Sequence, residues 1–474
     1  MSHRPLYMKS RYRYLKWFLW LVFVIGVVIC GSYGFSWRRT PQDLVTHSIL
    51  KDKTFEAKVQ EIVSPQLKIK AYLIEDKTNP IISVSFLFKN AGYATDNEGE
   101  QGIANLVASL LTEGTAELTA QQLKEELESR AIAVSFAADR DDFSGSLLTT
   151  RDNMFKAFAL LRDMLGHPRF ETDDIMRAKA VLTEAIRRQN EHPQNRLSLR
   201  MNEVLFAGHP YGRNPLGKTK DINRISETQL RQFVADNLNR QNLIVGIAGD
   251  INKNEAERML DNVFADITSS GRINFVRTPE IKFDGRKVLM SEPTGQNISL
   301  KAVAGVGRND ADFYPLFIAN QILGGSGLTS RLSQEIREKR GLTYGVYSYL
   351  DLSDKAPLLM AGFATTAENY AEAEKLFAKE WNAFSKNGVS AEELAKAKNY
   401  LIASYNLRFS SISGIADILA AMQKYNLGAD FLKKRNEYVK EVTLEQVNNV
   451  AKKYFDVNRL VSVSIGRFNE ETRE

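Results

Sequence analysis

The 474-residue sequence predicts an α+β protein made of two homologous domains, each a largely antiparallel sheet packed with helices, preceded by one N-terminal transmembrane helix. Three observations lead to this prediction: an internal repeat, alternating strands that continue into amphipathic helices, and an apolar segment near the N-terminus. With 43% hydrophobic and 25% charged residues, the chain is typical of a globular protein with sizeable cores.

The internal repeat spans most of the chain. Residues 82–84 resemble 298–300 at an offset of 216, residues 103–105 resemble 318–320 at an offset of 215, and 226–249 resembles 443–466 at an offset of 217. A nearly constant offset over this distance indicates two homologous domains and not a solenoid, whose repeats are far shorter. We place them at 57–268 and 287–474, joined by a polar, proline-containing linker at 269–286.

Periodicity predicts the elements inside each domain. Alternating apolar residues at 82–88 predict a strand, and an apolar strand closes each half. Apolar residues recur at spacings of three and four over about 173–189, which predicts an amphipathic helix. Ser226 and Gln229 have the spacing of a capping box, so a second helix is expected to begin there.

The N-terminal segment carries the excess positive charge. The net charge is +6, but seven of the 63 basic residues precede the first acidic residue, which leaves 56 basic against 57 acidic residues. This distribution gives no support to nucleic-acid binding. Residues 17–35 are apolar enough for a membrane span, with a basic cytoplasmic tip at 1–16 and a tether at 36–56. The expected localisation is therefore the bacterial inner membrane, single-pass, with the N-terminus cytoplasmic and the body periplasmic.

A cleaved signal peptide is the alternative interpretation of the same segment, although no clear small-x-small cleavage site follows it. Cys30, the single cysteine, lies within this segment. The body therefore has neither a disulfide nor a thiol nucleophile in either case.

Several motifs resemble those of the pitrilysin/insulinase family of zinc metallopeptidases, in the order found in that family. The run NAG at 90–92 followed by EGEQGIANLVASLLTEGT at 98–115 is similar to the family's first motif. Later matches are Glu184 in VLTEAIRRQNEHP, HPYG at 209–212, GD at 249–250, LTSRL at 328–332 and IREKRGLTYGVY at 336–347. The resemblance covers about residues 55–470 and implies a two-domain peptidase fold of the bacterial type.

The resemblance also implies that the zinc site is lost. Active members carry H-x-x-E-H on a helix, where the two histidines bind zinc and the glutamate is the general base. Asn105, Ala108 and Ser109 occupy those three positions here. Glu184 matches the third ligand, and Arg177 stands where active members commonly have another acidic residue. One carboxylate cannot hold zinc, so no metal or other cofactor is expected on this chain.

By the same resemblance, Arg337 and Tyr344 match an Arg/Tyr pair that reaches the substrate from the C-terminal domain. In two-chain relatives this pair and the zinc motif lie on different subunits. We therefore expect a non-catalytic subunit of a heterodimeric zinc endopeptidase that acts on unfolded peptides, with zinc bound by an H-x-x-E-H-bearing homologous subunit. Arg337 would bind a peptide carbonyl or carboxylate, and Tyr344 would donate a hydrogen bond to the oxyanion.

Other interpretations stay open at this point. The chain can be a non-enzymatic peptide-binding or scaffold protein with the same fold. Arg337 and Tyr344 can simply flank a helix end with Gly341 as its C′ residue. Asn105 and Ser109 can serve a helix–helix hydrogen bond, and Glu184 can be an ion-paired surface carboxylate.

Overall fold

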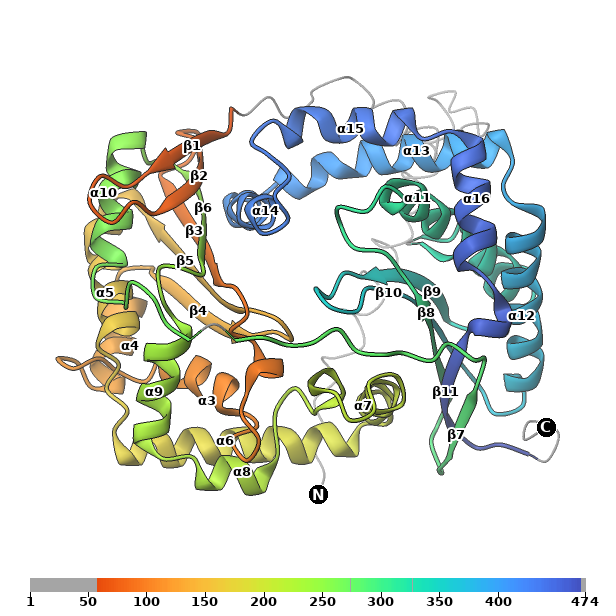
Figure 1. Cartoon of the computed structure of the whole chain (residues 1–474), viewed down its shortest axis with the longest axis horizontal. Helices are drawn as coiled ribbons and strands as arrows, with labels where there is room; N and C mark the ends of the chain where they lie inside the picture. Colours follow the sequence, from red (N-terminus) through yellow and green to blue (C-terminus); the bar gives the residue numbers. More distant parts are fainter. Residues whose placement is uncertain (1–57, 273, 326, 470–474) are drawn as a thin grey trace, which may run out of the picture. The chain divides into compact units, whose positions relative to one another are not determined.

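The computed structural model describes residues 58–272, 274–325 and 327–469, which belong to one compact unit, 55–474. This part contains two sheets (Figure 1), with strand orders β1-β2-β6-β3-β5-β4 and β7-β11-β8-β10-β9. The strands are β1 Gln60–Val63, β2 Lys70–Glu75, β3 Ile81–Phe88, β4 Ala133–Ala138, β5 Phe143–Thr150, β6 Leu243–Gly249, β7 Lys287–Ser291, β8 Asn297–Ala304, β9 Gly345–Asp351, β10 Leu358–Thr365 and β11 Val461–Gly466.

The two sheets repeat one topology, which confirms the predicted two-domain α+β fold. Among the described residues, each sheet has one parallel pair of strands: β2 with β6 in the first sheet, and β7 with β11 in the second. All other neighbouring strands in the two sheets are antiparallel. The order β2-β6-β3-β5-β4 therefore corresponds strand for strand to β7-β11-β8-β10-β9, as the constant sequence offset requires.

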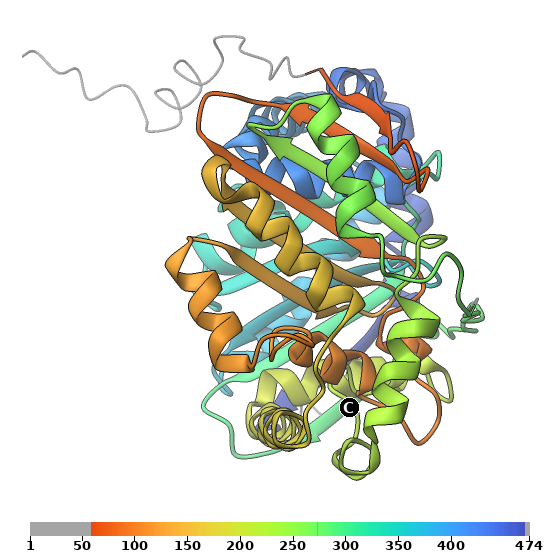
Figure 2. The ribbon, with the colours of Figure 1, turned by 90° about the vertical axis from the view of Figure 1, so that its left-hand side faces the viewer.

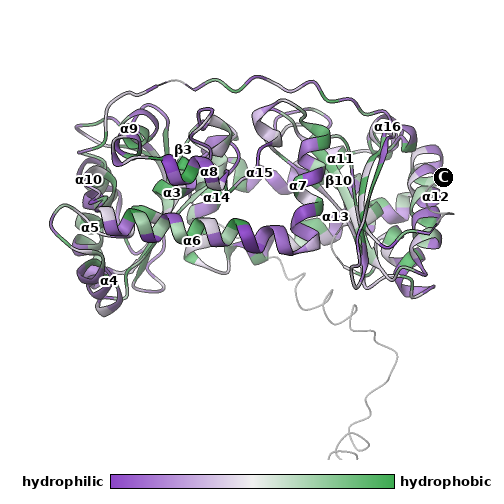
Figure 3. Ribbon diagram, turned by 90° about the horizontal axis from the view of Figure 1, so that it is seen from below, coloured by the Kyte–Doolittle hydropathy of each residue, from purple (hydrophilic) through white to green (hydrophobic). Residues whose placement is uncertain are grey.

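Helices follow the strands in the same order in both halves. Figure 2 shows α4, α5 and α10 lying across one face of the first sheet. The helix predicted at 173–189 is α6, along which hydrophobic and hydrophilic residues alternate (Figure 3), and the predicted capping box opens α9. The helices are α3 Ile103–Leu110, α4 Ala120–Ser129, α5 Met154–Gly166, α6 Thr172–Glu191, α7 Pro193–Leu205, α8 Thr219–Arg224, α9 Glu227–Asn237, α10 Lys253–Val263, α11 Phe313–Gly324, α12 Tyr370–Asn387, α13 Ala391–Tyr405, α14 Ile412–Lys424, α15 Phe431–Glu441 and α16 Leu444–Tyr454.

The predicted membrane localisation is corrected. In the part of the chain that the structure describes, no helix is long and apolar enough to cross a membrane. The predicted span at 17–35, with its tip and tether, lies outside the described residues. We therefore do not retain the assignment to an inner membrane with a periplasmic body.

Each sheet is covered on its second face by a helix from the other half. α14 packs on β6, β3 and β2 of the first sheet, and α7 packs on β11 and β8 of the second. The approach is close at Gly246 of β6, where an added Cβ would lie 2.3 Å from the carbonyl oxygen of Ala416 on α14. Two of the four apolar clusters consist of residues from both halves. Neither sheet completes its burial with its own half alone.

Equivalent hairpin tips also meet between the halves. Arg140, at the β4–β5 turn, donates to Asp351 Oδ2 at 3.2 Å and to Ser353 Oγ at 2.5 Å. The neighbouring Asp142 carboxylate contacts Lys424 Nζ of α14 at 2.5 Å, with both side chains largely buried. Paired charges in a buried position need each other, because one left alone would be desolvated without compensation.

Asp96 fixes the start of α3. Its Oδ2 accepts a hydrogen bond of 2.7 Å from the backbone N–H of Gly102, the residue that precedes the helix. Its Oδ1 is buried without a hydrogen-bond partner among the described residues. Burial raises the pKa of this carboxyl to about 7, although the N–H of Gly102 acts against the rise.

The buried ion pair between Asp142 and Lys424 of α14 predicts a loss of stability on Lys424→Met. The substitution leaves Asp142 buried without its main partner, which should cost about 3 kcal/mol of unfolding free energy, as measured by chemical denaturation. Lys396→Met is the control, because the ion pair of Lys396 with Glu392 is highly exposed and contributes little. Equal stability of the two variants would contradict the role given to Lys424.

The raised pKa of Asp96 predicts a stability that depends on pH. The folded state keeps a proton that the unfolded chain releases near the ordinary aspartate pKa of 3.8, so this stabilisation is complete below that pH and is lost as the pH rises through about 7. Asp96→Asn keeps an acceptor for the Gly102 N–H but does not ionise. Thermal midpoints between pH 5 and 8, compared for the two proteins, should fall more steeply for the wild type. Parallel profiles would argue against a titrating Asp96.

Candidate functional site

The three substituted zinc-motif positions lie on α3, which packs against α6. Asn105 Nδ2 donates to the carbonyl oxygen of Pro215 at 2.7 Å, so it tethers a loop and does not bond to another helix. Ser109 Oγ donates to the carbonyl of Leu106, one turn earlier in its own helix, at 2.8 Å. Ala108 is buried. The three side chains therefore contribute to packing and to hydrogen bonds with backbone carbonyls. The hydrogen bonds of Asn105 and Ser109 do not connect α3 to another helix, contrary to that alternative expectation.

Glu184 lies on α6 and is held by arginines. Its Oε2 accepts from Arg187 at 2.7 Å, and its Oε1 accepts from Arg188 at 2.8 Å. Hydrogen bonds from Arg187 and then Arg188 lower the pKa of this exposed carboxyl to about 2. Arg177, on the same helix, pairs with Asp174 and lies 3.8 Å from Glu113. A metal at Glu184 would have to displace two guanidinium groups.

The residues around Glu184 do not fit a zinc ion. The three motif positions on α3 hold an amide, a methyl and a hydroxyl, and both the amide and the hydroxyl already hydrogen-bond to backbone carbonyls. Among the described residues, no group of three or more His, Cys, Asp or Glu side chains is placed to hold a metal. No step of zinc chemistry can therefore be derived from this chain.

In the second half, Arg337 lies on a π-helical turn, Ser333–Glu338. Turns of this kind occur frequently at functional sites. The turn is closed by Gly341 in the left-handed region (φ 61°), whose N–H donates to the Arg337 carbonyl at 2.9 Å. The Arg337 side chain is 42% exposed and has an ion-pair contact with its neighbour Glu338 at 3.5 Å. Its guanidinium therefore has free donors for an external acceptor.

Tyr344 precedes β9, the edge strand of the second sheet, and its side chain is 81% exposed. Tyr347 and Tyr349 follow on β9, are also exposed, and have ring centroids 6.1 Å apart. Sequence reasoning missed these two residues, although their spacing of two on a strand places both side chains on one face. Tyr347 and Tyr349 make an aromatic surface on the edge strand, and the exposed Tyr344 immediately precedes that strand.

The structure does not bring the two sets of predicted residues into contact. Among the described residues, no hydrogen bond or ion pair joins Arg337 or Tyr344 to the side chains of α3 or to Glu184. Chemically, the first set offers no ligand or base, whereas the second offers hydrogen-bond donors and aromatic surface. This combination can bind and polarise a peptide but supplies no nucleophile.

The comparison with protein families covers both halves of the chain. Residues 70–219 match the model described as "Insulinase (Peptidase family M16)", and residues 224–401 match "Peptidase M16 inactive domain". Together these ranges span most of the chain and correspond to the two repeats seen in the sheets.

Individual relatives agree with this assignment. "Non-peptidase homolog YmxG" of Helicobacter pylori is 24% identical over 83% of this chain and 91% of its own length, and "Uncharacterized zinc protease YmxG" of Bacillus subtilis is 22% identical over 75% and 86%. The crystal structure of a peptidase M16 inactive domain from Pseudomonas fluorescens aligns with a TM-score of 0.81 and 29% identity, covering 87% of this chain and 98% of that one.

These names support the absence of catalytic activity in the chain alone, since "inactive domain" and "non-peptidase homolog" describe relatives of this kind. The predicted motif positions on α3, whose polar side chains bond to backbone carbonyls, and the arginine-paired Glu184 are compatible with these names. The chain belongs to the insulinase family, peptidase family M16.

Proposed function

We propose that this chain is the non-catalytic, peptide-binding subunit of a heterodimeric zinc endopeptidase. A homologous subunit bearing H-x-x-E-H would supply the zinc ion and the general base. The observation that carries the proposal is the contrast between the halves: the zinc-motif positions on α3 are committed to the fold, whereas Arg337 and Tyr344 remain exposed.

The chemistry of the exposed pair supports this role. A guanidinium binds a carboxylate or carbonyl with two donors, and a phenol donates one hydrogen bond to an oxyanion. Such a donor contributes only when another group forms the tetrahedral intermediate, so the pair is useful in a site that a partner completes. Arg337 lies on the π-helical turn, and Gly341, in the left-handed conformation, stands between Arg337 and Tyr344 in the sequence.

A second candidate is a peptide-binding or scaffold protein without any role in hydrolysis. The tyrosine surface at β9 favours it, because stacked aromatic side chains beside an edge strand bind extended chains without chemistry. The two candidates differ in whether an H-x-x-E-H-bearing partner binds.

The proposed assembly predicts stoichiometric recovery of a zinc-binding homologue. The tagged chain, purified from its native cells, should bring down an H-x-x-E-H-bearing homologue in near-equal amount, identified by mass spectrometry and confirmed by size-exclusion chromatography of the pair. Recovery without such a homologue would favour the scaffold candidate.

Once the pair is reconstituted, Tyr344→Phe should lower its turnover of a peptide substrate by about a hundredfold, because one oxyanion donor is lost. Phenylalanine keeps the ring, so assembly and peptide affinity should change little. Tyr400→Phe, at another exposed tyrosine on α13, is the matched control. Unchanged turnover of the Tyr344 variant would remove its proposed role while leaving the assembly intact.

A further inference from the structure

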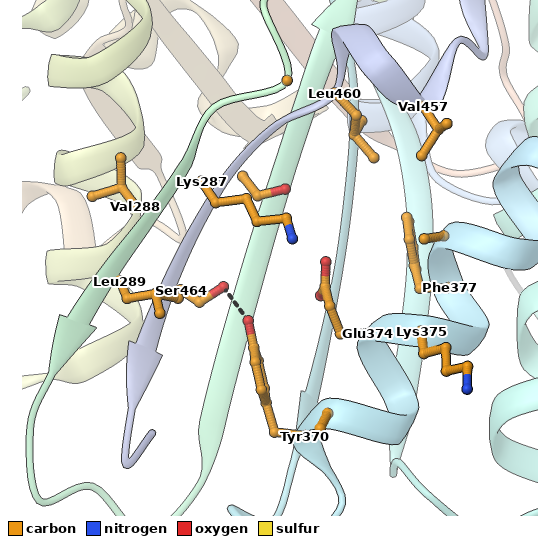
Figure 4. Close-up of a pocket in the computed structure, with 14 residues that line it drawn as sticks. Lys287, Val288, Leu289, Tyr370, Glu374, Lys375, Phe377, Val457, Leu460 and Ser464 are labelled. Carbon is orange, nitrogen blue, oxygen red and sulfur yellow. Dashed lines mark hydrogen bonds between the residues drawn. The ribbon is translucent and has the colours of Figure 1, made fainter. Parts of the chain in front are cut away.

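A pocket of about 290 Å³ lies in the second half between β7, β11 and α12 (Figure 4), and neither Arg337 nor Tyr344 lines it. Its walls include the apolar side chains of Leu289, Leu460 and Phe377. Its volume is at the small end of the range for ligand sites, so it suits a molecule of few atoms.

The equivalent place in the first half is filled. There α10 packs against α5, β1 and β2, as Figure 1 also shows. α5 corresponds to α12, and β2 corresponds to β7, because each of these strands is the parallel neighbour in its sheet. Among the described residues, no helix follows β11 to cover the corresponding surface.

The base of the pocket is formed by polar residues, whereas the equivalent strand position in the first half holds apolar residues. In the first sheet Phe86 pairs with Val245, and in the second Lys301 pairs with Ser462 at the same strand positions. The fifth residue of α5 is Phe158, and the fifth residue of α12 is Glu374. An apolar core contact in one repeat is thus replaced by an ion pair and a hydroxyl in the other.

This replacement forms a connected polar cluster. Lys301 is 1% exposed, and its Nζ contacts Glu374 Oε1 at 2.5 Å and Ser462 Oγ at 3.2 Å. Tyr370 donates to Ser464 at 2.8 Å beside it. A buried ion pair contributes less to stability than well-packed apolar residues do, so the fold alone does not call for it.

One positive charge at the pocket is left over. Lys301 and Glu374 neutralise each other, whereas Lys287 on β7 has no hydrogen bond or ion pair among the described residues. Figure 4 shows the Lys287 ammonium directed into the pocket, toward the side where Glu374 lies. Lys375 also lines the pocket, but its ammonium is turned away.

We propose that this pocket binds a small carboxylate with a short apolar body. The carboxylate accepts hydrogen bonds from Lys287, and the apolar body lies against Leu289 and Leu460. Two sources share this chemistry: a free organic acid, or the acidic residues of the chain's own segment 470–474. That segment follows Phe468, whose ring packs on Tyr370 at a centroid distance of 5.1 Å.

The test is isothermal titration of hexanoate and of its amide, hexanamide, into the whole chain and into a chain shortened after Asn469. Hexanoate should bind at least one of the two proteins, and hexanamide should bind at least tenfold more weakly because it lacks the charge. Lys287→Gln should weaken hexanoate binding at least tenfold. Lys375→Gln should change it less than twofold.

Binding to the whole chain would identify a free acid as the ligand, and binding only after shortening would identify the chain's own carboxylates. Ser462→Val, which introduces the residue of the first half, should also weaken binding and tests the polar base apart from Lys287. The proposal is overturned if neither protein binds hexanoate, or if binding is the same in the Lys287 and Lys375 variants.

Discussion

In each sheet, a helix from the other half covers the second face of the central strands. α14 covers the first sheet and α7 the second, and the contact is close enough that β6 carries a glycine beneath α14. Because apolar burial is the main favourable contribution to folding, neither half is expected to be stable in isolation. Two polar contacts between the halves add to this packing: Arg140 donates to Asp351 of the other hairpin, and Asp142 pairs with Lys424 of α14.

The packing of α7 and α14 on the sheets of the opposite halves also restricts motion between the halves. A peptide-binding protein can close either within one chain or between two chains. In this chain a hinge between the halves would expose the apolar faces of both α7 and α14 and would separate the buried Asp142–Lys424 pair. Both costs oppose opening within the chain. For the proposed peptide-binding role, closure is therefore favoured at a contact with a second subunit.

The sequence predicted the local features well because these depend on short-range physics. The capping box at Ser226, the amphipathic period of α6 and the left-handed Gly341 each follow from a few neighbouring residues. The offset between repeats predicted two equivalent sheets.

The packing of α7 and α14 on the sheets of the opposite halves was not predictable, because an amphipathic helix has the same pattern whichever sheet it covers. The partner of Asn105 is Pro215, 110 residues away, and no spacing rule indicates such a contact. The pairing of Glu184 with Arg187 and Arg188 does follow from helical spacing.

Two sets of positions in the repeats bear on function: the predicted motif positions on α3, and the strand position that holds Phe86 in the first half and Lys301 in the second. On α3, the predicted motif positions hold Asn105, which bonds to the distant Pro215 carbonyl, the buried Ala108, and Ser109, which bonds within its own helix, and the helix packs against α6. At the strand pair that contains Phe86 in the first half, the second half instead holds Lys301 against Ser462. At the first set of positions, α3 is packed against α6. The second introduces a charge into a core position, which is costly unless that charge is used. The side chains best suited to binding therefore lie in the second half, which contains both the exposed Arg337 and Tyr344 and the buried polar cluster around Lys301.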